Sequence, residues 1–223
     1  MKKAISVMSG GLDCTVATSI FANTHEIHAI TFNYGQKAAK KEIEVSKKIC
    51  EKMGWTHEVI DLPWLSQIST SSLNTDEEIP EITNDDLDDI NKSQESASSV
   101  WVPARNTVFT SIALSYAESI NASAIIVGWN NEEGATFPDN SKEYMEKFNE
   151  LIKEGSPEKI RIEAPLIELN KEEIIKKGVE YGAPIELSYS CYKGDENPCG
   201  ICESCMRRKR AFRKLGLEDK YEN

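Results

Sequence analysis

The chain has 223 residues, which fits one domain, or one domain with a small appendage, and is enough to bury a real core. Its formal net charge of −11 disfavours nonspecific adhesion to nucleic acid or to an anionic membrane, so we expect neither as a partner. No apolar run approaches the roughly 20 residues of a membrane span, and no export signal is visible, so we expect a cytoplasmic protein.

The first predicted unit is a strand over residues 4–8, a glycine turn and a helix that carries Val16, Ala17, Ile20 and Phe21. The turn reads Ser-Gly-Gly-Leu-Asp-Cys-Thr over residues 9–15. Two glycines allow a tight turn with inward-facing N–H groups, and the helix adds its unpaired N-terminal amides, so this cradle is predicted to bind phosphate. No lysine follows the glycines to reach the terminal phosphates, which favours binding of a pyrophosphate group by this turn.

The turn resembles the S-G-G-x-D-S signature of the PP-loop ATP pyrophosphatases, which split ATP into AMP and pyrophosphate while activating a substrate oxygen as an adenylate. Cys14 stands where that family usually has serine, and a thiol accepts hydrogen bonds weakly. The resemblance implies contacts with ATP along the turn and the first helix, at Met8, Ser9, Gly10, Gly11, Leu12, Asp13, Cys14, Thr15, Val16, Ala17 and Thr18.

Apolar runs and helical patterns continue to alternate, which predicts a doubly wound, mostly parallel α/β fold. Further strands are expected over residues 27–32, 58–62 and 124–128. The expected helices cover residues 38–53, ended by Gly54, residues 106–120, and a segment that begins after Asn170 with a variant of the capping box. Ligands in such sheets bind beyond the carboxyl ends of the strands.

A long polar segment, residues 66–99, interrupts this alternation and is predicted to be a lid-like insertion or partly disordered. It contains four aspartates over residues 85–89, which are better interpreted as a solvated face than as a metal site. We expect one α/β domain over residues 1–187 and a small zinc-binding segment over 188–223 packed on the same domain.

Cys191, Cys199, Cys202 and Cys205 have the spacing C-x7-C-x2-C-x2-C. Four thiolates match the ligand count of a closed tetrahedral zinc site, whose role is structural because no coordination position is left for water. A redox pair or an iron–sulfur cluster are the alternatives. Cys50 lies on a predicted amphipathic helix and is expected to be a buried core thiol.

The cysteine segment resembles the tail of the QueC family of 7-cyano-7-deazaguanine synthases, as do Val-Pro-Ala-Arg-Asn over residues 102–106 and Phe-Pro-Asp over 137–139. The match is ordered and spans nearly the whole chain. The resemblance implies that 7-carboxy-7-deazaguanine, ammonia and ATP are converted to the nitrile through an adenylated carboxylate, an amide and an adenylated amide. It also implies zinc and Mg²⁺ as metals, and we expect a homodimer.

Three side chains are predicted to serve this chemistry. Asp13 is the candidate near magnesium, because carboxylate oxygens suit a hard cation, although it can also cap the helix. Arg105 is expected to hold phosphate or the substrate carboxylate bidentately, unless it pairs with the acidic insertion. Asp139 is expected to accept the two N–H groups of the guanine-like edge, with Trp129 or Phe137 stacked on the ring.

Two other functions remain open at this point. A tRNA sulfurtransferase also pairs this loop with cysteines, but it should show a basic surface and usually a separate RNA-binding domain, and the acidic chain shows neither. A noncatalytic zinc- and nucleotide-binding protein, or a relative that adenylates another molecule, is the second alternative.

Overall fold

Five strands form the central sheet of the computed structural model, which describes residues 1–222. They are β1 (Lys2–Val7), β2 (His25–Asn33), β3 (Thr56–Asp61), β4 (Ala124–Ile126) and β5 (Arg161–Glu163). Their order is β3-β2-β1-β4-β5, and every neighbouring pair is parallel. The prediction of a doubly wound parallel sheet is therefore confirmed. The chain reverses its direction of travel across the sheet between β1 and β4, which is where such folds open a crevice.

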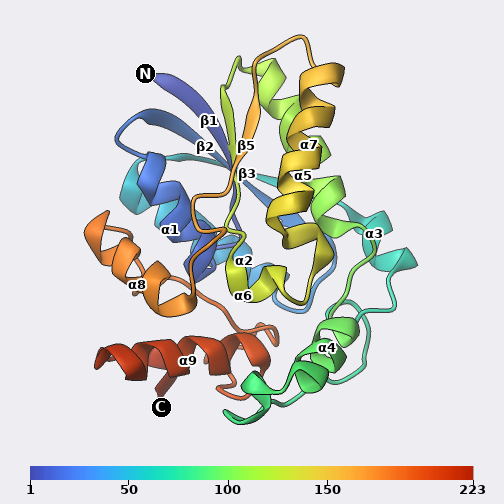
Figure 1. Cartoon of the computed structure of the whole chain (residues 1–223), viewed down its shortest axis with the longest axis vertical. Helices are drawn as coiled ribbons and strands as arrows, with labels where there is room; N and C mark the ends of the chain where they lie inside the picture. The colour runs from blue at the N-terminus through green and yellow to red at the C-terminus, as the bar shows by residue number, and fades with distance from the viewer. Residues whose placement is uncertain (223) are drawn as a thin grey trace.

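Helices cover both faces of the sheet. Figure 1 shows α1 and α8 on one side and α5 and α7 on the other, while α9 crosses beyond the carboxyl ends of the strands. The helices and 3₁₀ turns are α1 (Leu12–Phe21), α2 (Ala39–Met53), α3 (Pro63–Ile68), η1 (Asp86–Asp88), α4 (Ile90–Ser99), α5 (Arg105–Ser119), α6 (Asn131–Gly134), η2 (Pro138–Asn140), α7 (Lys142–Gly155), α8 (Lys171–Glu180), α9 (Glu203–Leu215) and η3 (Lys220–Glu222).

Local sequence signals explain several element boundaries. Gly54 ends α2 with a φ of 71°, a left-handed conformation that a residue with a side chain rarely adopts. Asn170 and Glu173 form the predicted capping box at the start of α8. Cys50 is 1% exposed in the core, as expected. Sequence patterns did not predict α7, and they did not predict β5, whose three residues are too short a pattern.

The C-terminal segment shares its core with the sheet. Phe212 of α9 belongs to one buried cluster with Val16 of α1, Ile174 of α8 and Ile27 of β2. Arg208 of α9 is 1% exposed, and its guanidinium bonds to both carboxylate oxygens of Asp219 at 2.6 and 2.9 Å. This segment is therefore packed on the α/β domain.

Residues 66–99 also lie against the C-terminal segment. The amide of Ile82 donates to the carbonyl of Ile201 at 2.8 Å, and the Ser96 hydroxyl donates to the Glu203 carboxylate at 2.5 Å. Within the aspartate cluster, Asp89 caps α4 by accepting bonds from two backbone amides, and Asp86 accepts a bond from the backbone amide of Thr83. These carboxylates bond to the local backbone, and the role of the insertion as a lid stays a prediction.

Candidate functional site

The turn between β1 and α1 is the segment predicted to form a phosphate cradle, and its shape depends on glycine. Gly10 has a φ of +71°, and a Cβ atom there would lie 2.9 Å from Cγ1 of Val45, so both conformation and space require glycine. Gly11 is the N-cap of α1. Because glycine has no side chain, no side-chain cap is bonded to the N-terminal amides of this helix. The amide of Tyr189 donates to the Gly10 carbonyl at 2.8 Å, so the C-terminal segment helps to fix the turn.

The Cys14 side chain bonds to the backbone of this turn. Its sulfur accepts a bond from the Ser9 amide at 3.4 Å and donates to the Gly11 carbonyl at 3.3 Å. Burial raises the pKa of the Cys14 thiol, which favours its neutral form. The substitution of cysteine for serine is therefore compatible with an anionic ligand.

A pocket of about 220 Å³ opens beside this turn, at the carboxyl ends of β1 and β4. Of the residues predicted to contact ATP, the described structure places Met8, Ser9, Gly11, Leu12, Asp13 and Cys14 in its lining and does not place Gly10, Thr15, Val16, Ala17 or Thr18 there. Val16 and Ala17 are core residues, and the hydroxyls of Thr15 and Thr18 bond to backbone carbonyls of the same helix. The pocket therefore contacts the turn and the first residues of α1.

Close packing holds β4 against this turn. A Cβ atom at Gly128 would lie 2.6 Å from the Cys14 backbone nitrogen and 2.8 Å from the Asp13 carbonyl carbon. Any larger residue must push the start of α1 away from the end of β4. Gly128 is thus required for the relative position of the two strand ends that frame the pocket.

Asp13 lies in the pocket wall and is paired with a lysine that sequence reasoning missed. The Nζ atom of Lys171 lies 2.9 and 2.7 Å from the two oxygens of Asp13, and the two side chains are 8% and 17% exposed. The same Nζ lies 3.8 Å from a carboxylate oxygen of Glu133, which also lines the pocket. Burial raises the pKa of Asp13, although the charge of Lys171 lowers it. Lys171 comes from α8, far along the chain, so no local motif could indicate it.

Arg105 lies in the same pocket, at the first position of α5. Its guanidinium donates to the Tyr34 hydroxyl at 3.2 Å. No carboxylate among residues 1–222 forms an ion pair with Arg105 within 4.0 Å, so the predicted pairing with the acidic insertion is not observed. Arg105 is partly buried, and a pocket guanidinium without a carboxylate ion pair is suited to binding an anionic ligand.

Asp139 does not reach the surface of this pocket in the described structure; its neighbour Asn140 does. Its carboxylate accepts a bond from the Asn106 backbone amide at 3.3 Å, and the Asn106 side chain donates to its backbone carbonyl at 3.2 Å. Burial raises the pKa of Asp139, opposed by the nearby charge of Arg105. Asp139 therefore holds the start of α5, and direct recognition of a base by Asp139 stays a prediction.

The two aromatic side chains expected to stack on a base make different contacts. Trp129 lines the pocket and packs edge-on against Tyr144, with 5.6 Å between ring centroids. Phe137 packs parallel to Trp101 at 6.4 Å. The structure thus brings only Trp129 of this pair to the pocket.

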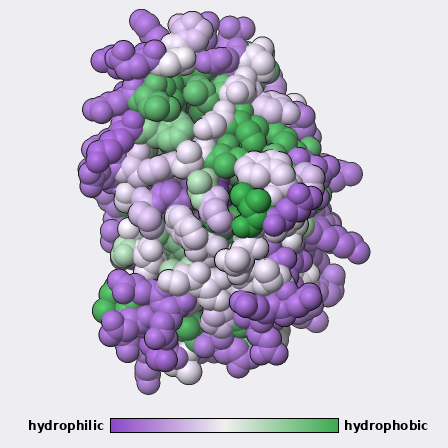
Figure 2. Space-filling view, turned by 90° about the vertical axis from the view of Figure 1, so that its right-hand side faces the viewer, coloured by the Kyte–Doolittle hydropathy of each residue, from purple (hydrophilic) through white to green (hydrophobic). Residues whose placement is uncertain are grey.

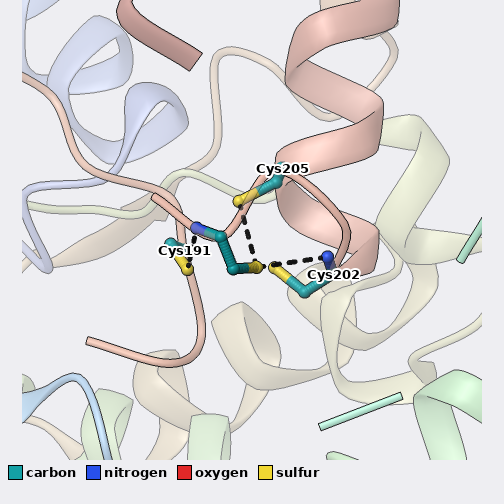
Figure 3. A group of neighbouring side chains, drawn as sticks. Cys191, Cys202 and Cys205 are labelled. Carbon is teal, nitrogen blue, oxygen red and sulfur yellow. Dashed lines mark hydrogen bonds between the residues drawn. The ribbon is translucent and has the colours of Figure 1, made fainter. Parts of the chain in front are cut away.

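The four C-terminal cysteines meet as predicted. Their sulfur atoms all lie within 4.8 Å of one another, and none of them forms a disulfide. Figure 3 shows Cys191, Cys202 and Cys205 with their sulfur atoms turned toward a common centre. Tetrahedral coordination with bonds of about 2.3 Å spaces sulfurs about 3.8 Å apart. The 3.9 Å between the sulfurs of Cys199 and Cys205 fits that geometry, so this cluster could hold a metal ion.

Arg207 and Arg210 of α9 form ion pairs with acidic side chains. Arg207 lies between Glu132 and Glu203, at 3.0 and 2.8 Å, and Arg210 lies 2.7 Å from Asp88. Glu132 in turn accepts a bond from the Lys171 backbone amide at 2.9 Å. An ion pair and a backbone hydrogen bond therefore connect Arg207 of α9 with Lys171, the residue that pairs with Asp13.

Together, a doubly wound sheet, a glycine turn at the start of α1 and a pocket at the strand ends define a nucleotide-binding α/β protein of the PP-loop type. The model of the family described as "Queuosine biosynthesis protein QueC" matches residues 3–216, and the chain belongs to this family.

Curated relatives named 7-cyano-7-deazaguanine synthase are similar along their whole length. The relative from Methanobrevibacter smithii is 63% identical over 221 residues, which cover 99% of this chain and 97% of the relative. The relative from Methanocaldococcus jannaschii is 50% identical over 227 residues, which cover 98% and 97%. The relative from Methanothermobacter thermautotrophicus is 49% identical over 220 residues, which cover 99% and 98%.

Proposed function

We propose that the protein converts 7-carboxy-7-deazaguanine, ammonia and ATP into 7-cyano-7-deazaguanine. The observation that carries this proposal is that one pocket combines the glycine cradle with the guanidinium of Arg105, which has no carboxylate ion-pair partner within 4.0 Å among the described residues. A cradle of amides is suited to the pyrophosphate part of ATP, and a fixed guanidinium is suited to a carboxylate. Membership of the QueC family supports the same reaction.

The first adenylation depends on the relative position of the substrate carboxylate and the α-phosphate more than on a general base. A carboxylate is ionised at neutral pH and can attack the α-phosphate of ATP directly, forming the acyl adenylate and releasing pyrophosphate. We assign to Arg105 the role of orienting the substrate carboxylate. Arg105 is held by its bond to the Tyr34 hydroxyl, and the start of α5 is held by the bond from the Asn106 amide to Asp139.

The remaining steps repeat this activation. Ammonia attacks the acyl carbon, the C–O bond to AMP breaks, and one proton leaves the nitrogen, which gives the amide. A second ATP adenylates the amide oxygen, and elimination of AMP with loss of the remaining N–H protons gives the nitrile. The same cradle and the same guanidinium serve both activations, because both place an oxygen of the C7 substituent at the α-phosphate.

Asp13 is the proposed holder of magnesium, with Glu133 beside it. Both carboxylates line the pocket, and oxygen donors of this type suit a hard cation. When bound, magnesium would neutralise charge on the phosphates. Lys171 keeps Asp13 in place at the edge of the cradle.

Zinc is the proposed ion of the cysteine cluster, in a structural role. The ligand set has four thiols and the sulfur spacing of a tetrahedral site, and it lies at the start of α9. Holding this segment also holds Tyr189, whose amide bonds to the glycine turn. A zinc ion would therefore stabilise the cradle at a distance.

We also propose a homodimer in the cytoplasm, where ATP is available and thiols stay reduced. Trp64 and Ile68 of α3 and Leu151 of α7 are 45%, 59% and 62% exposed. Figure 2 shows apolar patches on the face that lies at the right of Figure 1, where these helices are drawn. Exposed apolar surface of this kind is suited to self-association.

No helix of the described residues is long and apolar enough to cross a membrane.

Incubation of the purified protein with 7-carboxy-7-deazaguanine, ammonium and ATP, followed by mass spectrometry, tests the reaction. The amide should appear first and the nitrile afterwards. Omitting ammonium should abolish both products, whereas adding the amide directly should restore the nitrile without ammonium. Failure to form either product from the complete mixture would refute the proposed function.

A further inference from the structure

Glu42 is a carboxylate in the pocket that the reaction scheme leaves unused. It lies in the first turn of α2, and it lines the pocket together with Phe32 and Tyr34 from the end of β2. The Gln36 side-chain amide donates to one Glu42 oxygen at 2.8 Å and to the Phe32 carbonyl at 3.1 Å. Gln36 is 4% exposed, so the orientation of the Glu42 carboxylate is fixed by a buried partner.

The surroundings of Glu42 differ from those of Asp13. Asp13 has the ammonium group of Lys171 at both oxygens, whereas the described residues give Glu42 one neutral amide and no ion-pair partner within 4.0 Å. Burial raises the pKa of Glu42, while the Gln36 bond and the charge of Arg105 lower it. A partly desolvated carboxylate without an ion-pair partner is stabilised in its ionised form by further N–H donors. In this pocket a ligand can supply them.

A guanine-like edge supplies the matching donors. The ring N–H and the exocyclic amine of a 7-deazaguanine point in the same direction, and a carboxylate can accept both bonds in parallel. The corresponding edge of adenine has one amine beside an acceptor nitrogen, which faces a carboxylate unfavourably. Recognition by Glu42 would thus favour the base substrate over the adenine of ATP in this part of the pocket.

Arg105 and Tyr34 line the same pocket as Glu42. Arg105 contributes to the electrostatic surroundings of Glu42, and its guanidinium donates to the Tyr34 hydroxyl. The rings of Phe32 and Phe109 stack with 4.1 Å between their centroids and form an apolar part of the wall. An acceptor, a cation and an apolar wall are the groups needed to bind a flat base that carries a carboxylate.

We propose that Glu42 is the residue that reads the guanine-like edge of the substrate, by accepting its ring N–H and its exocyclic amine. This inference rests on the proposed function and names the specificity determinant of the same site. It assigns to α2 the role that the sequence alone suggested for Asp139, whose carboxylate bonds to the start of α5.

Calorimetry with Glu42→Gln, Asp139→Asn and the wild-type protein tests this assignment. The substitution Glu42→Gln keeps the shape and places a donor against a donor, so it should weaken binding of 7-carboxy-7-deazaguanine roughly ten- to hundredfold. ATP affinity should stay unchanged. Glu44→Gln on the same helix is the matched control, because Glu44 is exposed and pairs with Lys48; its affinities should equal those of the wild type.

A substrate analogue that lacks the exocyclic amine separates recognition from a structural effect. Wild type should bind this analogue more weakly than the substrate, and Glu42→Gln should bind the two with nearly equal affinity. If Glu42→Gln keeps the wild-type preference, or if Asp139→Asn alone removes it, the inference is overturned. Because binding is measured without turnover, failure of the proposed reaction would be recognised separately, as tight binding without product.

Discussion

Replacing Lys171 by methionine should destabilise the fold through Asp13. Methionine fills a similar volume but removes the charge from the two contacts of 2.9 and 2.7 Å. Asp13 would then be a mostly buried carboxylate with Glu132 and Glu133 as its charged neighbours, both of which oppose its ionisation. Breaking a buried ion pair by removing one partner typically costs about 3–5 kcal/mol in the free energy of unfolding.

The double variant Asp13→Asn, Lys171→Met separates the penalty of the unpaired charge from the loss of the lysine itself. With no charge left to desolvate, it should lie within about 1 kcal/mol of the wild type, since a buried pair and a neutral replacement are often equally stable. Urea unfolding of the wild type, both single variants and the double variant gives the coupling energy of the pair. Both variants that lack Lys171 should have lost most of the ATP-dependent activity, because the single variant no longer holds Asp13 at the cradle and the double variant lacks its carboxylate.

The pH dependence of the single variant gives an independent measure. Burial already raises the pKa of Asp13 above its ordinary value of 3.8, and loss of Lys171 removes a cause that lowers it. A raised pKa means that the folded protein binds the proton more tightly than the unfolded chain, so stability falls as the pH rises through this range. The deficit of Lys171→Met should therefore be full at neutral pH and shrink on acidification. A single variant as stable as the double variant at neutral pH would refute the reasoning.

Three further outcomes are expected. The purified protein should contain about one zinc ion per chain, and Cys202→Ser should release this ion and lower the melting temperature. Iron in place of zinc, or loss of the metal without an effect on folding, would contradict the structural zinc site. Turnover should release AMP and pyrophosphate in equal amounts, measured by chromatography, and ADP with orthophosphate would overturn the mechanism. His57, whose ring bonds to the Thr31 hydroxyl at 2.8 Å, has its pKa lowered from 6.5 by burial and by repulsion from Lys47. Its contribution to stability should therefore be present above pH 6.5 and be lost as the pH falls through the lowered pKa, and thermal melts of His57→Gln should show a weaker loss on acidification.

Local patterns in the sequence were sufficient for strands β1 to β4, the glycine turn and the cysteine cluster. A strand followed by two glycines and a helix can form the cradle from consecutive residues, because the turn and the helix N-terminus are made by the same short segment. The cysteines likewise lie within 15 residues of one another, from Cys191 to Cys205, so their spacing alone predicts that they meet. The resemblance to the QueC family rested on segments of the same kind.

Long-range packing decided which side chains surround the ligand. Lys171 reaches Asp13 across 158 positions of the sequence, and Glu42 enters the pocket because α2 packs beside the end of β2. Asp139 was placed correctly in the loop after β4, but the direction of its carboxylate depends on the start of α5. Sequence periodicity determines which residues face the core, whereas the partner of a buried charge is determined by elements that meet only in the folded chain.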